Sequence, residues 1–109
     1  MHWLPLVSYF FGGAFLANAV PHFVSGTMGR PLQSPFAKPP GEGLSSSTVN
    51  VVWGLLNVVI GYLLVLHVGS FDVRSMIHMA SLATGSLVTS LQLARHFGKF
   101  HGGNAPERS

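Results

Sequence analysis

The chain has 109 residues, enough for one small domain. Only 8% of the residues are Asp, Glu, Lys or Arg, whereas soluble domains average about 25%, and the mean hydropathy is +0.43. This balance argues against a soluble globular domain. The absence of cysteine excludes a disulfide, a thiolate zinc site and an iron–sulfur cluster built from this chain.

The nine charged residues leave three long neutral windows, at residues 1–29, 43–71 and 75–94. About 20 mostly apolar residues are enough for a helix to cross a bilayer, and each window reaches that length. The pattern predicts an all-α integral membrane protein, with three transmembrane helices in a small bundle that forms one domain over residues 1–109. It also argues against nucleic-acid binding, which a pI near 10 would otherwise suggest.

The first predicted span covers residues 3–24. A helix through all 29 neutral residues would be about 43 Å long, more than the hydrocarbon core of about 30 Å. We therefore expect it to stop near Pro21–Val24, because Pro21 lacks the backbone N–H of a continuing helix. The alternative is a signal peptide cleaved after Ala17-Asn18-Ala19, although no Lys or Arg precedes that site.

A long loop is predicted over residues 25–47, where four prolines and four glycines interrupt helical structure. Two interpretations are open: a rigid loop at the membrane interface, with Arg30 and Lys38 near anionic headgroups, or a clamp for a ligand or partner. The segments 21–26 (PHFVSG) and 29–41 (GRPLQSPFAKPPG), followed by 50–54 (NVVWG), resemble a stretch of small uncharacterised bacterial membrane proteins. The resemblance implies a membrane fold and carries no activity.

The second span is predicted at residues 48–68 and the third at 75–95, joined by a short turn, with a tail at 97–109. Three spans place five basic residues on one side of the membrane and Arg74 on the other. The positive-inside rule then predicts a multi-pass protein of the cell inner membrane, with the N-terminus outside and the C-terminus in the cytoplasm. The five basic residues are Arg30, Lys38, Arg95, Lys99 and Arg108.

Polar and small residues form a narrow stripe on each predicted helix. Four of them in the second span fall within about 40° of arc, and the third span carries a ladder of small residues four apart. Such stripes allow close backbone approach and hydrogen bonds between helices in lipid. The predicted helix contacts are Asn18, Asn50, Gly54, Asn57, Gly61, Ser81, Gly85 and Thr89.

Histidines are frequent, and their depths suggest two pairs. His22 and His96 lie near the cytoplasmic ends of the first and third spans, and His67 and His78 lie near the outer ends of the second and third. Facing imidazoles could ligate haem b, although each of these residues is also explained as an interfacial or hydrogen-bonded histidine. His96 and His101 have the wrong spacing for a metal site on one helical face.

No Lys, Asp or Glu occurs within a predicted span, and no catalytic set is evident. We therefore expect a non-catalytic accessory or assembly subunit of a larger membrane complex, or a homo-oligomer, whose partners are the lipid bilayer and other membrane subunits or itself. The first alternative is a bis-histidine haem b electron-transfer protein. The second is an oligomeric channel or transporter lined by Asn50, Asn57, Ser81 and Thr89.

Overall fold

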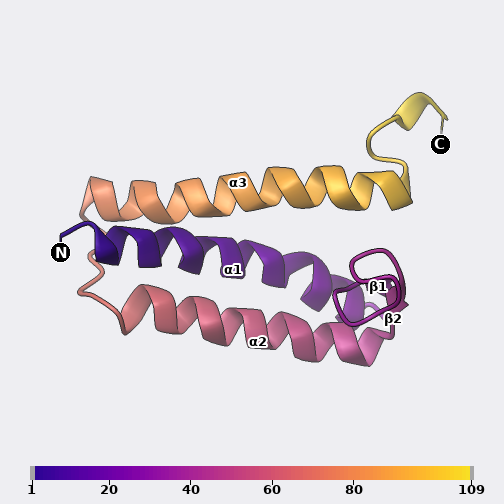
Figure 1. The fold of residues 1–109 in the computed structure, drawn as a ribbon, viewed down its shortest axis with the longest axis horizontal. Helices are drawn as coiled ribbons and strands as arrows, with labels where there is room; N and C mark the ends of the chain where they lie inside the picture. Colours follow the sequence, from indigo (N-terminus) through magenta and orange to yellow (C-terminus); the bar gives the residue numbers. More distant parts are fainter. Residues whose placement is uncertain (1, 109) are drawn as a thin grey trace.

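The computed structural model describes residues 2–108 and consists mainly of three long helices (Figure 1). These are α1 (Leu4–Thr27), α2 (Ser47–Leu66) and α3 (Met76–His101). Two short strands, β1 (Leu32–Gln33) and β2 (Leu44–Ser45), lie between α1 and α2, and a 3-10 turn, η1 (Pro106–Arg108), follows α3. The predicted all-helical architecture is confirmed, except for the strand pair.

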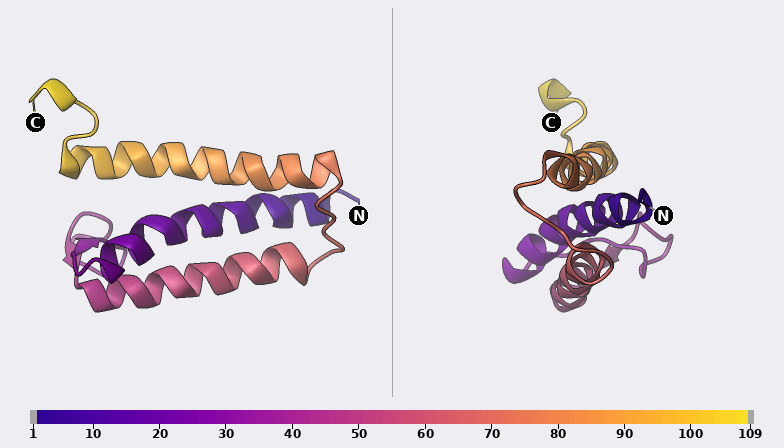
Figure 2. Two further views of the ribbon diagram at one scale, coloured as in Figure 1. Left: turned by 180° about the vertical axis from the view of Figure 1, so that it is seen from behind. Right: turned by 90° about the vertical axis from the view of Figure 1, so that its left-hand side faces the viewer.

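The three helices lie side by side with α1 in the middle (Figures 1 and 2). Helix α1 packs against both neighbours, while α2 and α3 make almost no contact with each other. Glycines permit the close approach of the backbones: a Cβ on Gly54 would lie 2.8 Å from the backbone N of Phe23, and one on Gly85 would collide with the carbonyl of Phe10. The central helix therefore organises the fold.

Serine side chains set where the second and third helices begin. Ser46 Oγ accepts a hydrogen bond from Val49 N, and Ser75 Oγ accepts one from His78 N, each at 3.2 Å. An N-cap of this kind satisfies one of the four unpaired N–H groups of a first helical turn. Gly102, at φ +83°, ends α3 in the left-handed conformation that favours glycine.

The prediction that the first helix stops near Pro21–Val24 is wrong, because α1 continues to Thr27. An interior proline costs roughly 3 kcal/mol, but the turns that follow it are held against α2. Gly26, for example, lies so close to α2 that a Cβ would be 2.6 Å from the carbonyl of Ser47. The helix bends in its second half, toward α2 and away from α3 (Figures 1 and 2). Helix α3 also runs six residues beyond its predicted end.

The segment between α1 and α2 is an ordered cap on one end of the bundle. Strands β1 and β2 pair antiparallel, with Leu32 opposite Ser45 and Gln33 opposite Leu44. Gly29 and Gly41 have φ of +74° and +77°, and the Lys38–Pro39 bond is cis. A long loop was predicted over residues 25–47. The strand pair orders most of it, and hydrogen bonds between Gly41 and His96 and between Gln33 and His101 join it to the end of α3.

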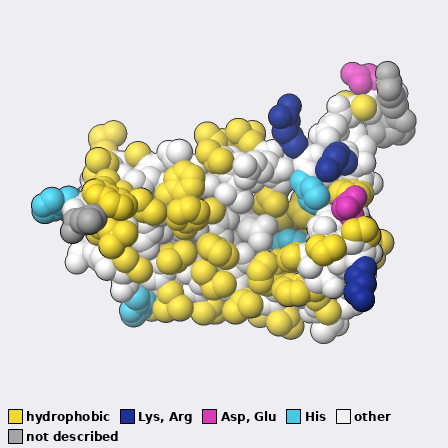
Figure 3. All heavy atoms as spheres, in the orientation of Figure 1, with side chains coloured by type: hydrophobic (Ala, Val, Ile, Leu, Met, Phe, Trp, Pro, Cys, Tyr) yellow, Lys and Arg dark blue, Asp and Glu magenta, His cyan; other side chains and the backbone are white. Residues whose placement is uncertain are grey.

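Helices α1 and α2 are long and apolar enough to cross a membrane, as judged by length and composition. Helix α3 does not reach the same apolarity, because Ser, Thr, Gln and His residues interrupt its apolar side chains, so the third span stays a prediction. On the face shown in Figure 3, hydrophobic side chains cover the helices, and the Lys, Arg, Asp and Glu side chains gather at the end with the cap and the C-terminus.

Candidate functional site

A cluster of buried polar side chains lies where the cap meets the helices. Its members come from α1 (His22), the cap (Gln33 and Ser34) and α2 (Asn50), and their exposed fractions are 3%, 6%, 1% and 0%. Polar groups are buried at little cost only when they are hydrogen-bonded, so each bond in this cluster matters for the fold. The hydrogen bonds of this cluster connect α1, the cap and α2.

Asn50 is the centre of the cluster. Its Nδ2 lies within hydrogen-bond distance of three backbone carbonyls, those of Leu32 (3.3 Å), Ser45 (3.1 Å) and Ser46 (3.0 Å). Its Oδ1 lies 2.6 Å from Nδ1 of His22. One side chain therefore joins the start of α2 to both strands of the cap and to α1.

This geometry determines which ring nitrogen of His22 carries hydrogen. Carbonyl oxygens only accept, so the amide NH2 of Asn50 must face them and its Oδ1 must face His22. An oxygen acceptor requires His22 Nδ1 to be the donor. In the neutral ring Nε2 then keeps a free lone pair, and no described residue forms a hydrogen bond with it. His22 thus offers one acceptor atom to a further group.

Aromatic rings surround His22. Trp53 packs edge-on against it at 6.4 Å between ring centroids, and Phe97 of α3 does so at 5.9 Å. In the described part of the chain, Trp53 Nε1 is the buried side-chain polar atom without a hydrogen-bond partner. An unsatisfied buried N–H is rare enough in folded proteins to need an explanation, such as an absent water or ligand.

A second polar contact lies deeper in the bundle. Asn18 Nδ2 donates to Asn57 Oδ1 at 3.0 Å, and Asn57 Nδ2 donates to the carbonyl of Trp53 at 2.7 Å. Beside it is a small cavity of about 180 Å³ lined by Asn18, Asn57, Thr89, Ala14 and Phe15. Four residues were predicted to line a channel. Asn57 and Thr89 line this cavity, whereas Asn50 and Ser81 do not.

The residues predicted as helix contacts occupy different environments. The four in α2, namely Asn50, Gly54, Asn57 and Gly61, are all buried. Asn18 bonds to Asn57 across the α1–α2 contact. In α3, Gly85 is buried, while Ser81 and Thr89 are half-buried.

Two further interhelical bonds were not singled out from the sequence. Ser8 Oγ donates to the carbonyl of Leu64 at 2.6 Å, and Ser86 Oγ donates to the carbonyl of Gly13 at 3.1 Å. Both acceptors are backbone groups on a neighbouring helix. No spacing rule could have found these bonds, because every residue carries a backbone carbonyl.

Each predicted haem ligand forms a hydrogen bond with another group of the chain. His22 pairs with Asn50, and His96 Nε2 lies 2.6 Å from the carbonyl of Gly41 in the cap. Phe97 packs against both rings, at 5.9 Å from His22 and 5.5 Å from His96.

At the other end of the bundle, His67 pairs with Tyr62, and His78 Nδ1 accepts from the backbone N of Asp72. Among residues 2–108, no group of three His, Asp or Glu side chains is placed to hold a metal ion. His101, which was considered with His96 as a metal pair, instead lies 2.9 Å from Gln33 Oε1.

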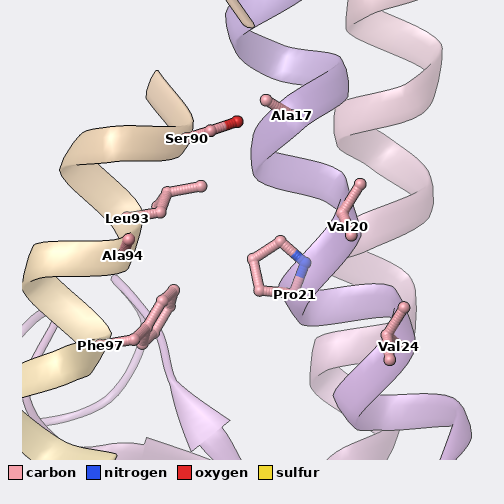
Figure 4. Close-up of a pocket in the computed structure, with 8 residues that line it drawn as sticks. All are labelled: Ala17, Val20, Pro21, Val24, Ser90, Leu93, Ala94 and Phe97. Carbon is pink, nitrogen blue, oxygen red and sulfur yellow. The ribbon is translucent and has the colours of Figure 1, made fainter. Parts of the chain in front are cut away.

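The bend at Pro21 opens an apolar cleft of about 390 Å³ between α1 and α3 (Figure 4). Leu93 and Phe97 project from α3 toward Pro21, with Ala17 and Ser90 at the opposite end of the cleft. Ala94, Val20 and Val24 complete the lining. Since Phe97 also packs against His22, the cleft lies next to the polar cluster.

The chain matches no protein-family model, no curated protein and no solved structure, so its function is argued from its own residues and their geometry.

Proposed function

We propose that the chain is a three-helix integral membrane protein that serves as a non-catalytic subunit of a membrane assembly, built with other membrane proteins or with copies of itself. Membrane integration is supported by the surface of α1 and α2. In each, only 28% of the apolar window is buried, whereas the core helix of a soluble protein would be mostly buried. An exposed apolar surface of this extent suits lipid.

The same proposal sets the orientation in the inner membrane. The cap and the end of α3 lie at one end of the bundle (Figure 1), and they carry Arg30, Lys38, Arg95 and Lys99. The turn between α2 and α3, at the other end, carries Asp72 and Arg74. The positive-inside rule supports a cytoplasmic cap and C-terminus and an external N-terminus.

The observation that carries the assembly role is the polar surface that α3 leaves uncovered. Gln92 is exposed, and its side chain forms no hydrogen bond with a described residue. In lipid, an unpaired amide costs several kcal/mol unless a neighbouring helix or water satisfies it. The stripe on α2, by contrast, is buried within the chain itself. A partner would therefore dock on α3.

Substitution on α3 tests this proposal, with Gln92→Leu as the probe. The matched control is Thr84→Val, because Thr84 is also exposed but its hydroxyl already donates to the carbonyl of Ala80 at 2.6 Å. The readout is recovery of an untagged copy, or of a second membrane protein in fixed proportion, with a tagged chain in mild detergent. Q92L should reduce recovery and T84V should not, and equal recovery for both variants would refute the role of α3.

A further inference from the structure

An apolar groove runs along the outer side of α2 beneath the cap. It has a volume of about 440 Å³ and is lined by Phe36, Thr48, Val49, Val52, Trp53 and Leu56. Thr48 lies in the first turn of α2, and Leu56 lies two turns deeper, so the groove passes from the predicted membrane surface toward the bilayer interior. Its polar group is at the surface end and its apolar groups extend inward.

Positive charge lies in the cap, close in sequence to a residue that lines the groove. Lys38 is exposed and is two residues from Phe36 in the same cap. Thr48 lies at the N-terminal end of a 20-residue helix, where the helix dipole favours a negative group. Between α1 and α2 the sequence has two basic residues, Arg30 and Lys38, and one acidic residue, Glu42, so the net charge of the cap is positive. The surface end therefore suits an anionic headgroup.

A second, independent observation comes from Trp53. Its ring lines the groove, while its buried Nε1 has no hydrogen-bond partner. Phe36 packs edge-on against this ring at 5.0 Å and is itself 60% exposed. An acceptor that entered the groove would satisfy a donor that the protein leaves unpaired.

We infer that the groove binds one anionic glycerophospholipid. An acyl chain lies along Val49, Val52 and Leu56, an ester carbonyl accepts from the indole N–H of Trp53 after Phe36 turns aside, and the headgroup phosphate lies near Lys38. This inference rests on the proposed membrane location. It assigns the cap a role in selecting a lipid, in addition to closing the end of the bundle.

Trp53 itself reports on the site. The chain has two tryptophans, so Trp3→Phe leaves Trp53 as the single fluorophore. The protein is placed in phosphatidylcholine nanodiscs that contain a small fraction of lipid with brominated acyl chains, which quench tryptophan on contact. Brominated phosphatidylglycerol should quench Trp53 at about fivefold lower mole fraction than brominated phosphatidylcholine, as one lysine near an anionic lipid predicts.

Matched variants test the groove and the charge separately. Val52→Phe fills the groove and should abolish the preference, whereas Val59→Phe, two turns away on the same exposed face, should leave it intact. Lys38→Gln should reduce the preference, and Lys99→Gln should not. Equal quenching by the two lipids, or the same loss in V52F and V59F, would overturn the inference.

A fully brominated bilayer separates this result from the membrane proposal. If Trp53 is quenched in this bilayer but shows no lipid preference in the mixed nanodiscs, the chain is in the membrane and the lipid site alone is refuted. If Trp53 is not quenched even there, the membrane location itself is refuted, and the lipid site with it.

Discussion

Replacement of Asn50 by Leu should loosen the cap and destabilise the bundle. Leucine has a similar size but cannot donate to the carbonyls of Leu32, Ser45 and Ser46 or accept from His22. The amide NH2 of Asn50 has two hydrogens and can donate to two of these carbonyls at once. Together with the bond from His22, three hydrogen bonds are therefore lost. At about 0.5–1.5 kcal/mol for each net bond, or about 0.6 kcal/mol for a bond between membrane helices, we expect a loss of about 2–4 kcal/mol.

The measurement has a global and a local part. The global part is the free energy of unfolding in bicelles. The local part is cleavage by a glutamate-specific protease after Glu42, in the cap; trypsin is unsuitable because Arg30 and Lys38 each precede a proline. Both readouts should change in N50L.

Asn18→Leu is the matched control, because it removes a single interhelical amide bond that does not involve the cap. It should cost about 0.6 kcal/mol and leave cleavage after Glu42 unchanged. If N50L costs no more than N18L, or leaves the cap equally resistant to the protease, then Asn50 does not hold the cap in the way that its contacts indicate.

Three further outcomes follow from the packing. Gly85→Ala should push α1 and α3 apart, because the new Cβ collides with the backbone carbonyl of Phe10, and we expect a loss of about 1–3 kcal/mol in the same unfolding assay. His96→Ala removes the contact with the carbonyl of Gly41 and should raise cap cleavage about fivefold, which corresponds to about 1 kcal/mol; unchanged cleavage would count against this contact. Pro21→Ala should restore a helical hydrogen bond, straighten α1 and narrow the cleft between α1 and α3. Cysteines introduced at positions 24 and 93 of this cysteine-free chain should then be joined by a shorter cross-linker than in the chain that keeps Pro21.

The packing of the helices determines which polar stripe is available to a partner. The stripe on α2 was predicted to make helix contacts, and α1 of the same chain covers it. Helix α3 has less of its surface buried, and among its residues only Gly85 and Gly98 are fully buried. The uncovered polar groups that need a partner are consequently on α3.

Local sequence alone determined the number of helices, the capping serines and the face of α2 that turns inward. These follow from hydropathy, from hydrogen bonding within one turn and from a period of 3.6 residues, all of which act over short stretches of chain. The end of α1 could not be found in this way. Pro21 disfavours the helix locally, and the helix continues because His22 and Gly26 pack against α2, more than twenty residues away along the chain.

The candidate site depended on tertiary structure to a greater degree. The sequence singled out His22 and Asn50 separately, one as a haem ligand and the other as a helix contact, but their pairing requires α1 and α2 to pack against each other. Trp53 carried no sequence signal, because its unpaired N–H exists only once Phe36 and His22 pack around it. Short-range periodicity thus determined the helices, while the cap and its site depend on contacts between residues that are distant in sequence.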